Sequence, residues 1–158
     1  MQSLLEKYWD INVDDSFWYE SLIEEFENQL TIAGFVDIKI CFTGFYSQGD
    51  GLNFTGYCSH NYIESNRLSE IYYNSVLDFI NLLKTKHCSF SIVKFSHHYE
   101  HENTVAVSSD LDTKLEEQLL EAARNIMQEF YRTLESGYNY LTSEEAVKET
   151  LIANNIAE

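Results

Sequence analysis

The chain has 158 residues, which is about the length of one domain and enough to bury a core without disulfides or metals. Its 10 basic and 26 acidic residues give a formal net charge of −16. This charge opposes binding to a nucleic-acid backbone, because phosphates would be repelled. We therefore expect a single domain, residues 1–158, that does not bind nucleic acid directly.

The acidic residues concentrate toward the two ends of the sequence. Residues 1–33 hold eight acids and one base, and residues 110–158 hold eleven acids and four bases, so that each segment carries a net charge of −7. Such a run of charge is usually a solvated face. The alternative interpretation is an acidic surface that meets a basic partner, for example a protein that normally holds DNA or RNA.

Cysteine usage and hydropathy favour a cytoplasmic protein. Cys41, Cys58 and Cys88 have no CxxC spacing and lie in apolar or strand-like sequence, which is typical of reduced core thiols. The first residues do not form a signal peptide, and no apolar run approaches the length of a membrane span. We expect no membrane partner, and the oligomeric state stays open.

The first predicted helix follows the N-cap candidates Asp14, Asp15 and Ser16 and ends at Gly34. Its apolar residues recur at helical spacing, at Tyr19, Leu22, Ile23, Phe26, Leu30 and Ala33. Three glutamates fall on the opposite face and are predicted to be exposed: Glu20, Glu24 and Glu27.

Residues 38–42 alternate apolar and polar side chains, and residues 52–58 restore this alternation, so they predict a β-hairpin. The connection holds a Gly-Asp-Gly turn that leaves Ser47, Gln48 and Asp50 at its tip. Gly44 interrupts the alternation and predicts a β-bulge. At least one of the glycines at 49 and 51 is expected to need a positive φ.

The next predicted helix runs from Asn66 to Lys86, and residues 90–95 and 105–107 predict a second hairpin. A long helix is then expected from a capping box at Thr113 to Gly137, followed by a short helix after a capping box at Thr142. The order is α-β-β-α-β-β-α-α. Because no βαβ crossover is required, we predict an α+β fold in which two β-hairpins form an antiparallel sheet with helices packed on one face.

Three histidines between the strands of the second hairpin have the side chains of a transition-metal site: His97, His98 and His101. On a continuous strand, however, the first and last would lie about 13 Å apart, too far for one ion. We therefore predict no metal site and interpret the histidines as solvated or hydrogen-bonded, or as part of a polar recognition surface.

The Gly-Asp-Gly turn has two functional interpretations besides that of a simple connector. Its glycines would free backbone N–H groups for a phosphate, but the P-loop lysine and the Rossmann spacing are missing. Ser47 lacks the context of a hydrolase nucleophile. We assign no catalytic residue and no cofactor, and we expect Gln48 or Asp50 to contact a partner if the turn is functional.

The segment GFYSQGDG at residues 44–51, with Phe54 and Gly56 after it, resembles a motif of a family of small acidic proteins of bacteriophages and bacteria. Residues 138–146 and 98–101 resemble further segments of that family, and the resemblance covers most of residues 35–152. Some members are labelled antitoxins. The resemblance implies an accessory factor that acts on host machinery in the host cytoplasm, and it implies no catalytic residue.

Two functional hypotheses follow. The first is an acidic protein that binds and inhibits or modulates a basic host or phage protein, such as a nuclease, a toxin or an antiviral-defence component, in the manner of a nucleic-acid mimic. It explains the net charge without an active site. The second is a small-molecule-binding or catalytic module in which the two hairpin tips meet. It explains the polar residues at those tips, but it does not explain the charge.

Overall fold

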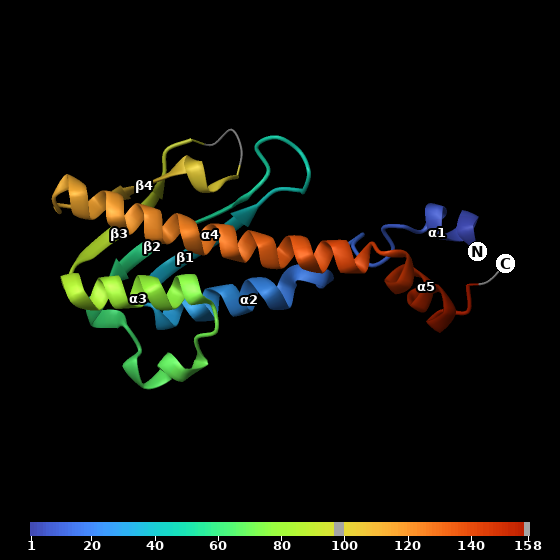
Figure 1. Ribbon diagram of the computed structural model, residues 1–158, viewed down its shortest axis with the longest axis horizontal. Helices are drawn as coiled ribbons and strands as arrows, with labels where there is room; N and C mark the ends of the chain where they lie inside the picture. Colours follow the sequence, from blue (N-terminus) through green and yellow to red (C-terminus); the bar gives the residue numbers. More distant parts are fainter. Residues whose placement is uncertain (97–99, 157–158) are drawn as a thin grey trace. The chain divides into compact units, whose positions relative to one another are not determined.

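The computed structural model describes residues 1–96 and 100–156 and has an α+β fold (Figure 1). The helices and strands, in chain order, are α1 (Gln2–Lys7), α2 (Phe17–Ile32), β1 (Phe35–Phe42), β2 (Leu52–Ser59), α3 (Asn74–Lys86), β3 (Ser89–Lys94), β4 (Val105–Ser108), α4 (Thr113–Leu141) and α5 (Glu144–Ala153). The strands form an antiparallel sheet in the order β1-β2-β3-β4. This confirms the predicted fold class; the short helix α1 was not predicted.

The chain divides into two compact units. One contains residues 24–131 and holds the whole sheet, whereas the other contains residues 1–23 and 132–158. In the second unit, the Asn12 side chain donates a hydrogen bond to the Leu141 carbonyl and accepts one from the Thr150 hydroxyl. That all 158 residues act as one domain stays a prediction.

The sheet is a meander, so its connections alternate between its two ends. The β1–β2 and β3–β4 connections therefore leave the sheet at the same end, while the β2–β3 connection, which includes α3, leaves at the other end. Helices lie against one face of the sheet (Figure 1). This topology places the two hairpin tips named by the sequence beside each other.

Aromatic side chains dominate the core of the larger unit. The Phe35 ring contacts the rings of Phe54 and Phe79, at centroid distances of 5.3 and 5.2 Å. Phe26 of α2 stacks on Phe130 of α4 with the centroids 4.2 Å apart, and both side chains are fully buried. The contact of Phe35 with Phe79 packs α3 on the apolar face of the sheet, and the contact of Phe26 with Phe130 packs α2 on α4. The other face of the sheet stays open.

The start of α2 agrees with the predicted caps, whereas the starts of α4 and α5 differ from the predicted caps by one residue each. Helix α2 begins directly after the candidates Asp14, Asp15 and Ser16, and the Asp15 carboxylate accepts a hydrogen bond from the Phe17 N–H. The N–H of Leu115 is bonded by Asp112 rather than capped by Thr113, and α5 is capped by Ser143 rather than Thr142. Asp112 lies one residue before Thr113 and Ser143 lies one residue after Thr142, and each accepts the same type of bond, so the capping-box spacing placed both caps one residue away from their positions. Helix α4 also continues through Gly137 to Leu141.

The helix predicted from Asn66 to Lys86 is interrupted. Residues Ser65–Glu70 form a separate 3-10 helix, and α3 begins only at Asn74. The buried Gln29 side chain explains the break, because its amide donates to the Glu70 carbonyl and accepts from the Tyr72 N–H. These bonds hold the intervening backbone outside a helix, and residue periodicity does not reveal them.

The predicted bulge at Gly44 was wrong. The register shift lies in β1 between Val36 and Lys39, where Asp37 has a φ of 54°. Gly56 of the neighbouring strand accommodates it, since a Cβ there would lie 2.9 Å from the Val36 carbonyl oxygen. Gly44 belongs to the connection that follows β1.

We expect Phe130→Ala to lower the free energy of unfolding by about 3–5 kcal/mol, because it removes a fully buried ring that stacks on Phe26 and touches Tyr73. Denaturant titration of the purified variant measures this loss. Phe95→Ala is the matched control, since Phe95 is 63% exposed and its loss should change stability by no more than about 0.5 kcal/mol. Equal effects of the two substitutions would contradict the packing described.

Candidate functional site

The open face of the sheet carries polar side chains and forms a groove. Directly paired residues of neighbouring strands point to the same side, and Lys39 of β1 pairs with Thr55 of β2. Tyr57 of β2 similarly pairs with Ser91 of β3. These residues line a hollow of about 550 Å³. The sequence contains no signal for this groove, because its residues are spread over three strands and no local pattern joins them.

An ion pair lies at one border of the groove. The Glu100 carboxylate accepts hydrogen bonds from the Lys94 ammonium and, at 2.6 Å, from the Asn53 amide. Asn53 also donates to the Thr104 hydroxyl at 3.1 Å and is 1% exposed. These bonds hold Glu100 and Thr104 against the strands β2 and β3.

The ion pair keeps Glu100 ionised. Burial alone would raise the pKa of Glu100, but hydrogen bonds from Lys94 and Asn53, together with the charges of Lys94 and Lys39, hold this pKa below its ordinary value. At neutral pH, Glu100 is therefore a fixed anion whose two oxygen atoms are both engaged. It is suited to hold structure in place rather than to exchange protons.

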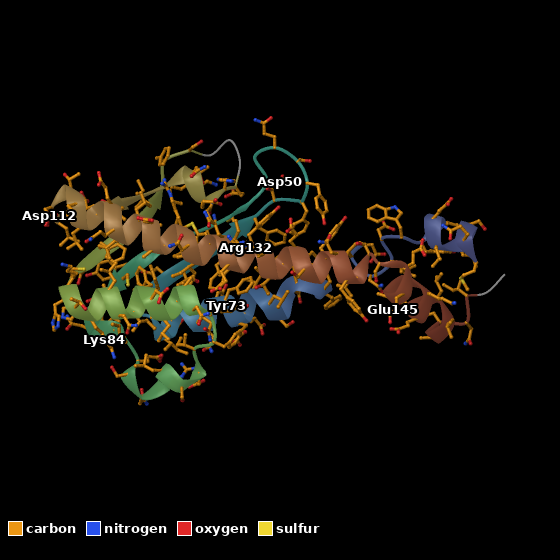
Figure 2. The ribbon with its side chains drawn as sticks, in the orientation of Figure 1. Asp50, Tyr73, Lys84, Asp112, Arg132 and Glu145 are labelled. Atoms are coloured by element: carbon orange, nitrogen blue, oxygen red, sulfur yellow. The ribbon has the colours of Figure 1, made fainter. Side chains whose placement is uncertain are left out.

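The turn at residues 44–51 is shaped by its own polar groups. Asp50 lies on the connection between β1 and β2 (Figure 2), and its carboxylate accepts a 3.1 Å hydrogen bond from the Ser47 N–H. Gly49 has a φ of 86°, which confirms the predicted need for a positive φ. Ser47 and Gln48 are exposed, whereas Asp50 is half-buried. Asp50 thus stabilises the turn, and Gln48 is available to a partner.

The two hairpin tips meet, as the second hypothesis required. Gly51 lies so close to His101 that an added Cβ would be 2.8 Å from the imidazole Cδ2. Gln48, Gly49, His101 and Asn103 line a hollow of about 370 Å³. His101 accepts the Asn103 N–H at Nδ1 and has its Nε2 3.6 Å from a Glu102 oxygen.

The other two histidines named by the sequence, His97 and His98, lie outside the described residues. Within residues 1–96 and 100–156, no group of three or more His, Cys, Asp or Glu side chains is arranged to hold a metal ion. The absence of a metal stays a prediction for the whole chain.

The three predicted acidic positions are exposed on α2: Glu20, Glu24 and Glu27. The Ser16 hydroxyl donates a 2.8 Å hydrogen bond to Glu20. Helix α2 contains no lysine or arginine, and among the described residues no basic side chain forms an ion pair with any of the three. The helix therefore presents a column of like charge.

The three cysteines are reduced and differ in their surroundings. Cys58 and Cys88 are buried, and burial raises the pKa of both thiols; the nearby Cys88 adds to the effect on Cys58. Cys41 is half-buried and lines the groove on the open face of the sheet. A chemical probe of the Cys41 thiol can therefore detect whether this groove is occupied.

Together these observations define a small α+β protein with an open polar sheet face and an acidic helix. The chain belongs to the family described as "Domain of unknown function (DUF8835)", whose model matches residues 18–144. No curated protein and no solved structure matches it. A search of the described helices found none with the length and apolar character needed to span a membrane.

The contact between the hairpin tips predicts that Gly51→Ala lowers stability by about 1–3 kcal/mol, since the new methyl group would overlap the His101 ring. Gly44→Ala is the matched control, because its nearest atom would be an Asp50 oxygen at an ordinary 3.5 Å. Thermal unfolding distinguishes the two variants. Adding His101→Ala to Gly51→Ala should recover part of the loss, and the absence of any recovery would contradict this contact.

The lowered pKa of Glu100 predicts a specific dependence of stability on pH. Its contribution is fully present above the ordinary carboxyl pKa of about 4.3 and is lost as the pH falls through the lower pKa of the folded state. Glu100→Gln should therefore be less stable than the natural chain at neutral pH, and this difference should shrink below about pH 4. Denaturant titrations across the acid range measure it. A difference that is constant with pH would show that the charge of Glu100 is irrelevant.

Proposed function

We propose that the protein is an acidic accessory protein that binds a basic surface of a host macromolecule and inhibits or modulates it. The observation that carries this proposal is the exposed column of Glu20, Glu24 and Glu27 on α2, a helix without any basic residue. The net charge of −16 adds a long-range attraction for a basic partner.

The arrangement of these glutamates argues for more than solubility. Glu20 and Glu24 are four residues apart and Glu24 and Glu27 are three apart, and like charges at these spacings destabilise a helix by a few tenths of a kcal/mol per pair. Surfaces designed for solubility usually intersperse both signs of charge. A column of negative charges therefore fits a contact with cationic side chains of a partner better than it fits solubility alone.

Nucleases, toxins and antiviral-defence components are the partners that fit this chemistry best. Proteins that hold nucleic acid carry lysine and arginine clusters, and carboxylates placed along a helix can pair with the same clusters that bind phosphates. The resemblance of residues 44–56 to phage and bacterial proteins, some of them labelled antitoxins, supports the same choice. In this proposal the acidic face takes the place of a nucleic acid.

One observation favours a second function, in which the hairpin tips bind a small molecule. Residues from both tips, Gln48 and His101 among them, line the hollow of about 370 Å³. The Ser47 N–H is bonded to Asp50, and the sequence around Ser47 lacks the context of a hydrolase nucleophile. A binding role at the tips is therefore favoured over nucleophilic catalysis.

The decisive experiment replaces Glu20, Glu24 and Glu27 together by Lys. This changes the net charge from −16 to −10 and should barely affect thermal stability, because all three side chains are exposed. Capture from host cells with the natural chain identifies a partner, and binding is then measured with both purified proteins. We expect affinity to fall about tenfold or more in the triple variant, and to fall with added salt.

A matched control separates a specific face from bulk charge. Replacing Glu117, Glu121 and Glu149 by Lys makes the same change in net charge at exposed positions of α4 and α5. This variant should retain nearly all binding. Equal losses in the two triple variants, or no loss in either, would remove the proposed role of α2.

A further inference from the structure

We propose that the groove on the open face of the sheet binds a small zwitterion with an apolar body, such as an amino acid with an aromatic or aliphatic side chain. The groove of about 550 Å³ lies within the range of roughly 300–1,000 Å³ that is typical of small-molecule sites. This proposal does not depend on the acidic face of α2, because it uses different residues.

Four charged side chains line the groove, and two of them are already engaged. Lys94 and Glu100 pair with each other, and the second oxygen of Glu100 accepts the Asn53 amide. Asp37 and Lys39 are both exposed, and within the described part of the chain neither forms an ion pair or a side-chain hydrogen bond. The groove thus offers one anion and one cation that form no ion pair or side-chain hydrogen bond among the described residues, while the charge of Lys39 also acts on Glu100.

These two charges lie at the bulge in β1. Asp37 has a φ of 54° and lies inside the register shift between Val36 and Lys39, so the strand is irregular at this point. Asp37 and Lys39 are only two residues apart, yet their charged atoms do not approach within 4.0 Å. A ligand that carries both charges can satisfy both side chains at once, with its carboxylate on Lys39 and its ammonium on Asp37.

Charge complementarity also selects a zwitterion over a simple ion. The four charged residues of the lining sum to zero, whereas the chain as a whole carries −16. A simple anion would be repelled by the protein, and a simple cation would be drawn to many acidic positions elsewhere. A ligand of zero net charge feels little of this field and is held by the local pair of charges.

The remaining surface of the groove supplies a place for the apolar body. Tyr57 is 38% exposed and Val93 is 40% exposed, and both line the groove beside the hydroxyl groups of Thr55 and Ser91. A half-exposed tyrosine ring offers an apolar surface on which an aromatic or branched side chain can pack.

Three probes with one ring test the proposal: L-phenylalanine, phenethylamine, which lacks the carboxylate, and 3-phenylpropionate, which lacks the ammonium. L-Leucine tests the nature of the apolar body. Binding is measured by NMR shifts of groove residues, and separately by protection of the Cys41 thiol from alkylation, since Cys41 lines the groove while Cys58 and Cys88 are buried. We expect at least one amino acid to bind with a Kd of about 1 mM or tighter, and both single-charge analogues to bind about tenfold or more weakly.

Two substitutions test which side chain of the groove binds each charge of the ligand. Lys39→Met should weaken binding of the amino acid about tenfold and leave binding of phenethylamine unchanged, because only the carboxylate of the ligand loses its partner. Asp37→Asn should weaken binding of the amino acid and of phenethylamine and leave binding of 3-phenylpropionate unchanged. Asparagine tolerates the positive φ at this position. Lys86→Met, which removes an exposed lysine from α3 outside the groove lining, should change nothing.

The proposal is overturned if neither amino acid saturates the groove, or if the analogues bind as tightly as the amino acids. It is also overturned if Lys39→Met and Lys86→Met have equal effects, or if the groove is protected only by a protein partner. Thermal unfolding of each variant confirms that it is folded. If Asp37→Asn fails to fold, the Lys39→Met comparison decides the result alone.

Discussion

The sheet of this protein buries one face, and that constraint organises everything else. Phe35, Phe54 and Phe90 are buried on the side that the helices cover, and strand alternation then sends the intervening residues to the other side. Burial of this aromatic layer supplies the main favourable term of folding, while the opposite face only needs to be compatible with water. That face is therefore free to carry Lys39 and Tyr57, and it can acquire a binding role at little cost in stability.

The meander order adds a second consequence. Because strands β1 to β4 are joined in sequence, both hairpin tips lie at one end of the sheet, and the absence of a side chain at Gly51 lets His101 approach. The ion pair of Lys94 and Glu100 and the bonds of Asn53 then hold Glu100 and Thr104 against β2 and β3. Local turn chemistry and long-range polar contacts thus cooperate, and neither alone would bring the tips together.

Much of this fold could be predicted from the sequence, because hydrophobic periodicity is a local signal. The apolar stripe of α2 and the alternation in β1 and β2 need only neighbouring residues, and they predicted the fold class and the exposure of Glu20, Glu24 and Glu27. The break before α3 depends on Gln29, more than 40 residues away from Tyr72. The groove depends on residues of three strands that have no common sequence pattern. Both features arise from tertiary contacts, which periodicity does not contain.

The chemistry of the groove favours binding over catalysis. A general acid or base works best when its pKa lies near the operating pH, and catalytic cavities accordingly shift the pKa values of carboxyl groups upward or those of lysines downward. Glu100 is shifted in the opposite sense, away from neutrality, and both its oxygen atoms are engaged. The other available charges, Asp37 and Lys39, are exposed to water, which leaves them suited to pair with a ligand's charges. In the two proposals, both surfaces recognise a partner or ligand by charge: the groove would do so through one anion and one cation, and the acidic helix through a column of one sign.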